Sequence, residues 1–158
     1  MKIKVGFGYD VHPLKENYPL YIGGVAIPHN KGAVGHSDAD VLLHAICDAL
    51  LGAASLRDIG YQFPDTSEKY KGIDSKILLK EVFLLLKKKA YKISNIDSTV
   101  CLQKPKLSPY IEEMRNIISV LLEIDIDDVS IKATTTEKLG FVGSEDGISA
   151  YAVVLIIK

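Results

Sequence analysis

The sequence predicts a single α/β domain of the α+β type, residues 1–158, in which three helices cover one face of a four-stranded mixed sheet. A chain of 158 residues has the usual size of one domain and is long enough to bury a core without disulfides. Its 47% hydrophobic and 25% charged residues are typical of a globular protein. Strand-like and helix-like patterns alternate along the chain, and no linker, repeat or low-complexity segment separates them.

Short apolar runs bounded by turn residues predict the strands. A small hairpin is expected about Gly23-Gly24, where two apolar runs of three residues flank a glycine pair. The predicted strands are Ile3 to Tyr9, Leu20 to Ile22, Val25 to Ile27, Ile93 to Gln103, Val129 to Thr135 and Ile148 to Ile157. The last strand is apolar on both faces, so both faces should be covered. Helices can cover one of them, and a homo-oligomer packed through its sheets would cover the other.

Helical spacing of apolar residues predicts three helices. The first is "HSDADVLLHAICDALLGAA", with Ser37 as its cap, Asp40 at the capping-box position, and Asp38 and Asp40 in its first turn. The second runs from Asp74 to Ala90. The third is "SPYIEEMRNIISVLL", with Ser108 as its cap and Pro109 in the first turn, where a missing N–H costs nothing.

Charge and hydropathy exclude several classes of protein. The net charge is −1 and no basic stripe is visible, so the sequence does not indicate a nucleic-acid partner. No apolar run reaches the ~20 residues of a membrane helix. The start "MKIKVGFGYD" has no signal-peptide core, which favours a cytoplasmic location. The two cysteines, Cys47 and Cys101, lie in apolar stretches outside any paired motif, which favours buried, reduced thiols.

An aspartate and two histidines have the spacing of a metal site. Asp10 and His12 alternate where the first strand is predicted to end, so they point to the same face. His44 follows Asp40 by four residues, so a second carboxylate can touch it and orient it. One oxygen and two nitrogens with an open fourth position form the pattern of a catalytic zinc site. The alternatives are that His44 is a hydrogen-bonded core histidine and that the aspartates only complement the helix N-terminus.

Three further segments are candidates for ligand binding. In "KATTTEKLGFVGSEDG", hydroxyls and backbone amides can cradle phosphates, and Glu137 can bind a hard cation such as Mg²⁺ or Mn²⁺. The alternative is a threonine-rich strand end followed by ordinary turns. The loops "RDIGYQFPDTSEKYKG" and "LQKPKLSP" are long and polar, which is common in functional loops, although both can be simple surface connections.

Taken together, these motifs resemble one family over nearly the whole chain. In order they are G-x-G-Y-D-x-H at Gly6 to His12, "GG" and "IP" within Gly23 to Pro28, "HSDAD" with His44, "DALLGAA", "DIG", "FPDT", "KPK" and "KATTTEKLGF". This set is similar to 2-C-methyl-D-erythritol 2,4-cyclodiphosphate synthase of the non-mevalonate isoprenoid pathway. The resemblance implies a homotrimer with active sites between subunits. It also implies release of CMP from a cytidine diphosphate ester of methylerythritol 2-phosphate, with formation of a cyclic diphosphate.

The resemblance also implies roles for individual residues. Asp10, His12 and His44 match the zinc ligands, and Glu137 matches the residue that reaches a second divalent cation, Mg²⁺ or Mn²⁺. His36 and Thr135, with Glu137, match the catalytic positions. The remaining positions matched to substrate contacts are Ser37 at the phosphates, Asp58 and Gly60 at the ribose, Phe63, Pro64, Asp65, Thr66 and Ser67 at the methylerythritol, Leu102, Gln103, Lys104, Pro105, Lys106, Leu107 and Ser108 at the cytosine, and Ile59, Thr134, Thr136 and Phe141 elsewhere in the substrate site.

The chemistry implied by the resemblance agrees with the residue types present. A phosphate nucleophile is already ionised near neutral pH, so charge neutralisation and positioning matter more than a general base. The sequence accordingly offers more ligand-type residues than acid–base residues.

Four positions depart from the family's usual pattern. Ser144 replaces an arginine, which weakens the expectation of an anionic isoprenoid ligand near the trimer axis. Ala39 replaces a glycine, Leu102 a smaller residue and Ser67 an aspartate. Two alternative functions stay open at this point. One is a zinc-dependent phosphohydrolase that uses metal-bound hydroxide. The other is a catalytically silent scaffold that binds a metal and a nucleotide.

Overall fold

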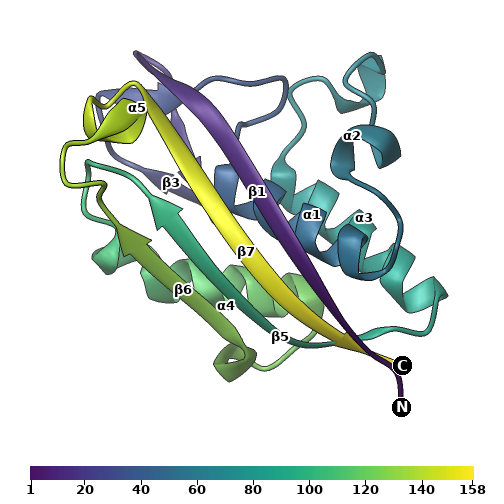
Figure 1. Cartoon of the computed structure of the whole chain (residues 1–158). Helices are drawn as coiled ribbons and strands as arrows, with labels where there is room; N and C mark the ends of the chain where they lie inside the picture. The colour runs from purple at the N-terminus through teal and green to yellow at the C-terminus, as the bar shows by residue number, and fades with distance from the viewer.

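One mixed sheet of five strands organises the computed structural model, which describes residues 1–158. Its strand order is β4-β1-β7-β5-β6, and a separate two-stranded sheet pairs β2 with β3 (Figure 1). All pairs in the large sheet are antiparallel except β5 and β6, which are parallel. The strands are β1 (Ile3–Glu16), β2 (Leu20–Ile22), β3 (Val25–Ile27), β4 (Lys31–Ala33), β5 (Lys92–Cys101), β6 (Val129–Thr134) and β7 (Gly147–Ile157).

Three longer helices cover one face of this sheet, as the sequence predicts (Figure 1). The α-helices are α1 (Val41–Ala53), α2 (Ile59–Gln62), α3 (Ser75–Lys88), α4 (Ile111–Leu122) and α5 (Gly140–Gly143). Single 3₁₀ turns lie at Glu68–Tyr70, Ser108–Tyr110 and Ile126–Asp128. None of the helices combines the length and apolar character that would be needed to span a bilayer.

Two glycines of β1 allow α1 to lie directly on the sheet. A Cβ on Gly6 would stand 1.8 Å from the carbonyl oxygen of Ala49, and one on Gly8 would stand 1.9 Å from that of Ala45. Only a residue without a side chain fits at such distances. This close approach positions the site, because it brings the start of α1 beside the middle of β1.

The first strand is longer than predicted, and the sheet has one more strand. β1 continues to Glu16 because it pairs with β7 as far as Pro13↔Gly147 and then with β4 at Leu14↔Ala33. Asp10 and His12 therefore lie inside a strand, not at its end. The prediction of four strands was wrong because β4 is only three residues long and carries no periodic pattern of its own.

Two predicted helix starts were also wrong. α1 begins at Val41, and its cap is Asp40, whose side chain accepts the N–H of Leu43; Ser37 and Asp38 precede the helix. The third helix begins at Ile111, after a 3₁₀ turn that contains Ser108 and Pro109, and Ser108 makes no capping hydrogen bond. The start of α3 was nearly right, since Asp74 caps it.

The sheet face away from the helices is apolar and open in the single chain. Phe7 is 63% exposed and Val153, its partner in the β1–β7 register, is 45% exposed. Tyr9 faces Tyr151 with ring centroids 5.1 Å apart. The opposite face of the same strands is buried, as at Ala150, Ala152 and Val154. β7 is thus apolar on both faces, as the sequence predicts, and one of those faces has no cover within the chain.

Candidate active site

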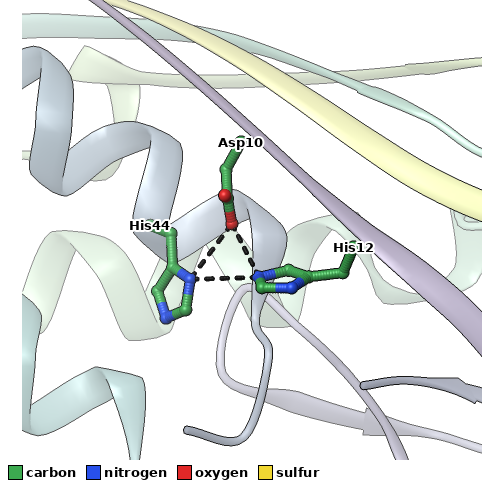
Figure 2. Close-up of side chains that lie close together, drawn as sticks. All are labelled: Asp10, His12 and His44. Carbon is green, nitrogen blue, oxygen red and sulfur yellow. Dashed lines mark hydrogen bonds and ion pairs between the residues drawn. The ribbon is translucent and has the colours of Figure 1, made fainter. Parts of the chain in front are cut away.

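Asp10, His12 and His44 converge at the contact between β1 and α1 (Figure 2). Asp10 Oδ2 lies 2.8 Å from His12 Nε2 and 3.0 Å from His44 Nδ1, and the two nitrogens are 3.3 Å apart. One atom from each residue can therefore face a common centre, and all three atoms lie within 4.8 Å of one another. An oxygen and two imidazole nitrogens are a donor set that suits Zn²⁺ and leaves a coordination position open.

Electrostatics at this cluster favour a cation. Burial acts to raise the pKa of Asp10, but hydrogen bonds from His12 and His44 and their charges outweigh it and lower that pKa to about 2. Burial acts to lower the pKa of His44, yet the hydrogen bond and charge of Asp10 raise it above its ordinary value. The carboxylate therefore stays ionised, and a cation bound at this cluster would take the place of a proton on His44.

The expected contact between the Asp40 carboxylate and the His44 ring does not occur. Asp40 is fully buried, and its carboxylate accepts the N–H groups of Gly23 at 2.9 Å, Gly24 at 2.7 Å and Leu43 at 3.0 Å. A capping carboxylate turns back toward the free N–H groups at the start of its own helix, so it cannot reach a side chain one turn later. His44 instead directs Nε2 to Ser75 Oγ at 2.8 Å and Ser37 Oγ at 3.1 Å.

A cavity of about 290 Å³ opens beside this cluster. The sequence-predicted residues His36, Ser37, Ile59, Gly60, Phe63 and Asp65 line it together with the cluster. His36 Nε2 stands 3.8 Å from Asp65 Oδ2, so the segment before α1 and the loop after α2 come close together at the cavity. Asp58 lies just outside and caps α2 through the N–H of Tyr61. Pro64, Thr66 and Ser67 belong to the same loop but do not line the cavity.

Sequence analysis did not identify four residues of this region. Tyr70, Ile73 and Leu78 line the cavity, and Ser75 contacts His44. Tyr70 lies in a loop that was named as a ligand-binding candidate but was not singled out within it, Ile73 follows that loop, and Leu78 belongs to the apolar stripe of α3. A serine at the first position of a helix is usually interpreted only as part of the helix start.

A second, smaller cavity of about 180 Å³ lies at the ends of β5 and β6. It is lined by Leu102, Gln103, Pro105, Lys106, Leu107, Ser108, Ala133, Thr134 and Thr135, of which only Ala133 had not been predicted. Lys104, which had been predicted, points elsewhere, with Nζ 3.4 Å from a Glu145 carboxylate oxygen. The peptide bond between Lys104 and Pro105 is cis.

Glu137 lies next to this second cavity. Its N–H donates to Thr135 Oγ1 at 3.3 Å, and the following N–H, of Lys138, donates to Gln103 Oε1 at 3.4 Å. Glu137 is not part of the Asp10–His12–His44 cluster. Thr136 closes the turn through Leu139, and Phe141 is half exposed in α5.

The two cavities share no lining residue within one chain. β7 and β5 lie between β1 and β6, which places the two strands three strand spacings apart, roughly 14 Å. The sequence-predicted site residues are therefore gathered into two groups rather than one.

For three of the four residues that depart from the family's usual pattern, the structure shows the surroundings that bear on the change. Ala39 is buried with φ 56°, a left-handed conformation that glycine adopts without strain. Leu102 is buried in the wall of the second cavity. Ser144 donates to Asp146 Oδ2 at 2.5 Å, so a neutral hydroxyl and a carboxylate stand where a basic side chain was expected. Ser67 precedes the turn Glu68–Tyr70 and its side chain makes no capping bond.

The fold and the cluster together define an α+β domain with a candidate divalent-metal site beside a ligand-sized cavity. The chain belongs to the YgbB family, whose model matches residues 3–157. It is 62% identical over 156 residues to 2-C-methyl-D-erythritol 2,4-cyclodiphosphate synthase of Bacteroides fragilis, covering 99% of this chain and 98% of that protein. Its identity to the protein of the same name from Cytophaga hutchinsonii is 57%, over 100% of this chain and 99% of that one.

Solved structures agree with these relatives. A 2C-methyl-D-erythritol-2,4-cyclodiphosphate synthase in a CDP-bound form has a TM-score of 0.91 and 36% identity, and the match covers 98% of this chain and 100% of that one. The bifunctional IspDF of Campylobacter jejuni has a TM-score of 0.94 and 42% identity, and the match covers 98% of this chain but 42% of that longer one. The resemblance found in the sequence is thereby confirmed.

Proposed function

We propose that this chain converts 4-diphosphocytidyl-2-C-methyl-D-erythritol 2-phosphate into 2-C-methyl-D-erythritol 2,4-cyclodiphosphate and CMP, as a step of the non-mevalonate isoprenoid pathway. The observation that carries the proposal is the Asp10–His12–His44 cluster beside a cavity that also contains His36, Ser37 and Gly60. High identity to synthases of that name along the whole chain, and likeness to a CDP-bound synthase, support it.

The reaction is an intramolecular phosphoryl transfer. An oxygen of the 2-phosphate attacks the β-phosphorus, the bond between that phosphorus and the bridging oxygen breaks, and the electron pair leaves with CMP. No proton has to be removed from an ionised phosphate, so the main demands are alignment and charge neutralisation. The enzyme is in this proposal a phosphorus–oxygen lyase acting through a single domain, residues 1–158, in the cytoplasm.

Two divalent cations would supply a template and Lewis-acid neutralisation of the phosphate charge. Asp10, His12 and His44 would hold Zn²⁺, and Glu137 would hold Mg²⁺ or Mn²⁺ together with the substrate phosphates. His36, Ser37 and Thr135 offer polar donors for the phosphate oxygens. Thr134 and Thr136 flank Thr135, at the end of β6 and at the start of the following turn.

The rest of the substrate is assigned to the two cavities. In the first, Asp58, Ile59 and Gly60 would contact the ribose, and the loop from Phe63 to Ser67 would cover the methylerythritol. The second would take the cytosine, through the backbone of Leu102 to Ser108 and the ammonium group of Lys106. Backbone N–H and C=O groups in a shallow pocket suit the hydrogen-bonding edge of a base.

We also propose a homotrimer with active sites between subunits. Two observations support it. The open face of β1 and β7 carries Phe7, Tyr9, Tyr151 and Val153, an apolar surface of a kind that marks an interaction site. The two cavities also share no lining residue within one chain, and a neighbour that brings its second cavity to the first would complete one site from two copies.

Phosphorus NMR tests the reaction directly. The purified protein is mixed with 4-diphosphocytidyl-2-C-methyl-D-erythritol 2-phosphate, Zn²⁺ and Mg²⁺, and the expected products are CMP and a cyclic diphosphate in equal amounts. Release of inorganic phosphate would favour the alternative of a zinc phosphohydrolase instead. An unchanged spectrum with zinc bound would favour the silent scaffold.

A further inference from the structure

The outer nitrogen of His44 is bonded into a chain of polar groups that the proposed reaction does not use. Nδ1 faces Asp10 and His12, whereas Nε2 faces Ser75 Oγ at 2.8 Å (Figure 2 shows the inner side). Ser75 has no exposed surface, and its hydroxyl is also hydrogen-bonded to Asp38 Oδ1. The other oxygen of Asp38 accepts the backbone N–H of Ser75 at 3.0 Å.

The number of protons on these groups decides which of them donates and which accepts in this series of hydrogen bonds. An imidazole that binds a metal through Nδ1 must carry its proton on Nε2, and a buried N–H requires an acceptor. Ser75 Oγ can accept it and then donate its own proton to Asp38, since an ionised carboxylate only accepts. The order of donation is therefore His44 to Ser75 to Asp38. In this arrangement the Nε2 proton of His44 and the hydroxyl proton of Ser75 each have an acceptor.

Ser37 is the natural comparison. Its Oγ stands 3.1 Å from the same Nε2, slightly farther than that of Ser75, and it accepts the N–H of Ala39 at 3.2 Å. Its hydroxyl makes no bond to a carboxylate. Ser37 is therefore a second, more distant hydrogen-bond partner of the same nitrogen, and it does not connect that nitrogen to a carboxylate.

We propose that Ser75 and Asp38 are positioning residues for the metal ligand His44. They hold the imidazole so that the lone pair on Nδ1 faces Asp10 and His12 before zinc arrives. Asp10 Oδ2, 3.0 Å from Nδ1, competes for the same ring proton. Without Ser75, the proton can stay on Nδ1 and occupy the position that the metal needs. The inference rests on the zinc site of the proposed function.

The same contacts also tie the start of α3 to the segment before α1, so a purely structural role has to be separated from positioning. Ser75 is the first residue of α3, and its N–H bond to Asp38 survives removal of the hydroxyl. Ser75→Ala therefore breaks this series of hydrogen bonds and leaves the backbone connection in place. Ser37→Ala is its matched control, because it removes a hydroxyl near the same nitrogen.

The experiment measures zinc affinity by competition with a chromogenic chelator, in the full-length protein. Ser75→Ala should weaken zinc binding by about 10- to 100-fold, the usual cost of losing the partner of a metal-bound histidine. Ser37→Ala should change it by less than about threefold, since the series of hydrogen bonds from His44 to Asp38 remains intact. Asp38→Asn should weaken it in the same direction, and it decides the question if Ser75→Ala does not fold.

A spectroscopic signal reports the bond itself. In the zinc-loaded protein the Nε2 proton of His44 should exchange slowly with water in long-range ¹H–¹⁵N spectra. It should exchange rapidly in Ser75→Ala and remain slow in Ser37→Ala. A lower melting temperature for Ser75→Ala with unchanged zinc affinity and unchanged exchange would overturn the proposal and leave only a structural role. A wild-type protein that binds no zinc would overturn the proposed metal site as well.

Discussion

The two cavities are built in different ways, although both contain residues that the sequence singled out. The first combines side chains from β1, α1 and the loop around α2, and its ligands are already hydrogen-bonded to one another. The second is formed largely by one loop, from Leu102 to Ser108, with the last two residues of β6 and Thr135, which follows them. The first is therefore preorganised for a cation, whereas the second presents backbone groups and one lysine. Each contains only part of what the proposed reaction needs.

The largest expected effect comes from removing the charge at the centre of the first cavity. Asp10→Asn should lose most of its zinc and lower turnover by about 10²- to 10³-fold, the range for deleting one electrostatic contact with a transition state. Zinc per subunit by mass spectrometry and the rate of CMP release measure the two quantities. Glu137→Gln, beside the second cavity, serves as the comparison, with turnover reduced to a similar degree and zinc retained. Full activity in zinc-free Asp10→Asn would mean that the ligand assignment is wrong.

A mixture of these two variants tests whether the cavities of different subunits work together. Co-expressed with different tags and purified through both, Asp10→Asn and Glu137→Gln should recover activity. Purification through both tags leaves only mixed trimers, and in each of these one site in three, or about a third of all sites, combines an intact first cavity with an intact second cavity from the neighbour. Turnover should therefore rise far above that of either variant alone. If the mixture stays as inactive as its components, each site lies within one subunit.

The smallest expected effect is the pH dependence of the first cavity. The pKa of His44 is raised, mainly by its contact with Asp10 against the effect of burial, so the imidazole keeps its proton to a higher pH than usual. A protonated ring cannot bind zinc, so affinity should be full once both ligand imidazoles are neutral and should fall with decreasing pH by about tenfold per pH unit for each proton that the metal must displace. Asp10, with a pKa of about 2, stays ionised and adds nothing to this slope. Zinc titrations at several pH values measure it, and a flat profile would contradict the prediction.

Much of both cavities could be predicted because their residues follow one another in short motifs. Alternation put Asp10 and His12 on one face of a strand, whatever the length of that strand. The loop from Leu102 to Ser108 is contiguous, so its residues stay together in any fold. Helix α3 was placed nearly correctly because its apolar spacing and its cap, Asp74, are local features.

The role of Asp40 could not be predicted, because two local rules competed for it. Spacing of four residues favours contact with His44, whereas its position before the helix favours capping. The hairpin decided between them, since it brings the N–H groups of Gly23 and Gly24 to that carboxylate. Ser75 had no signal at all, because it meets His44 only when α3 packs beside α1.

The sequence by itself determined the α+β class, the order of the main elements, the three residues of the candidate metal site and the family. These depend on residue type and on spacing along a chain, which survive without knowledge of contacts. Only the tertiary structure decided that β1 runs through Asp10 and His12, that His44 is supported by Ser75 and Asp38, and that the site residues divide between two cavities. Strand pairing and helix packing join residues far apart in the chain, and no local pattern records which partners they will meet.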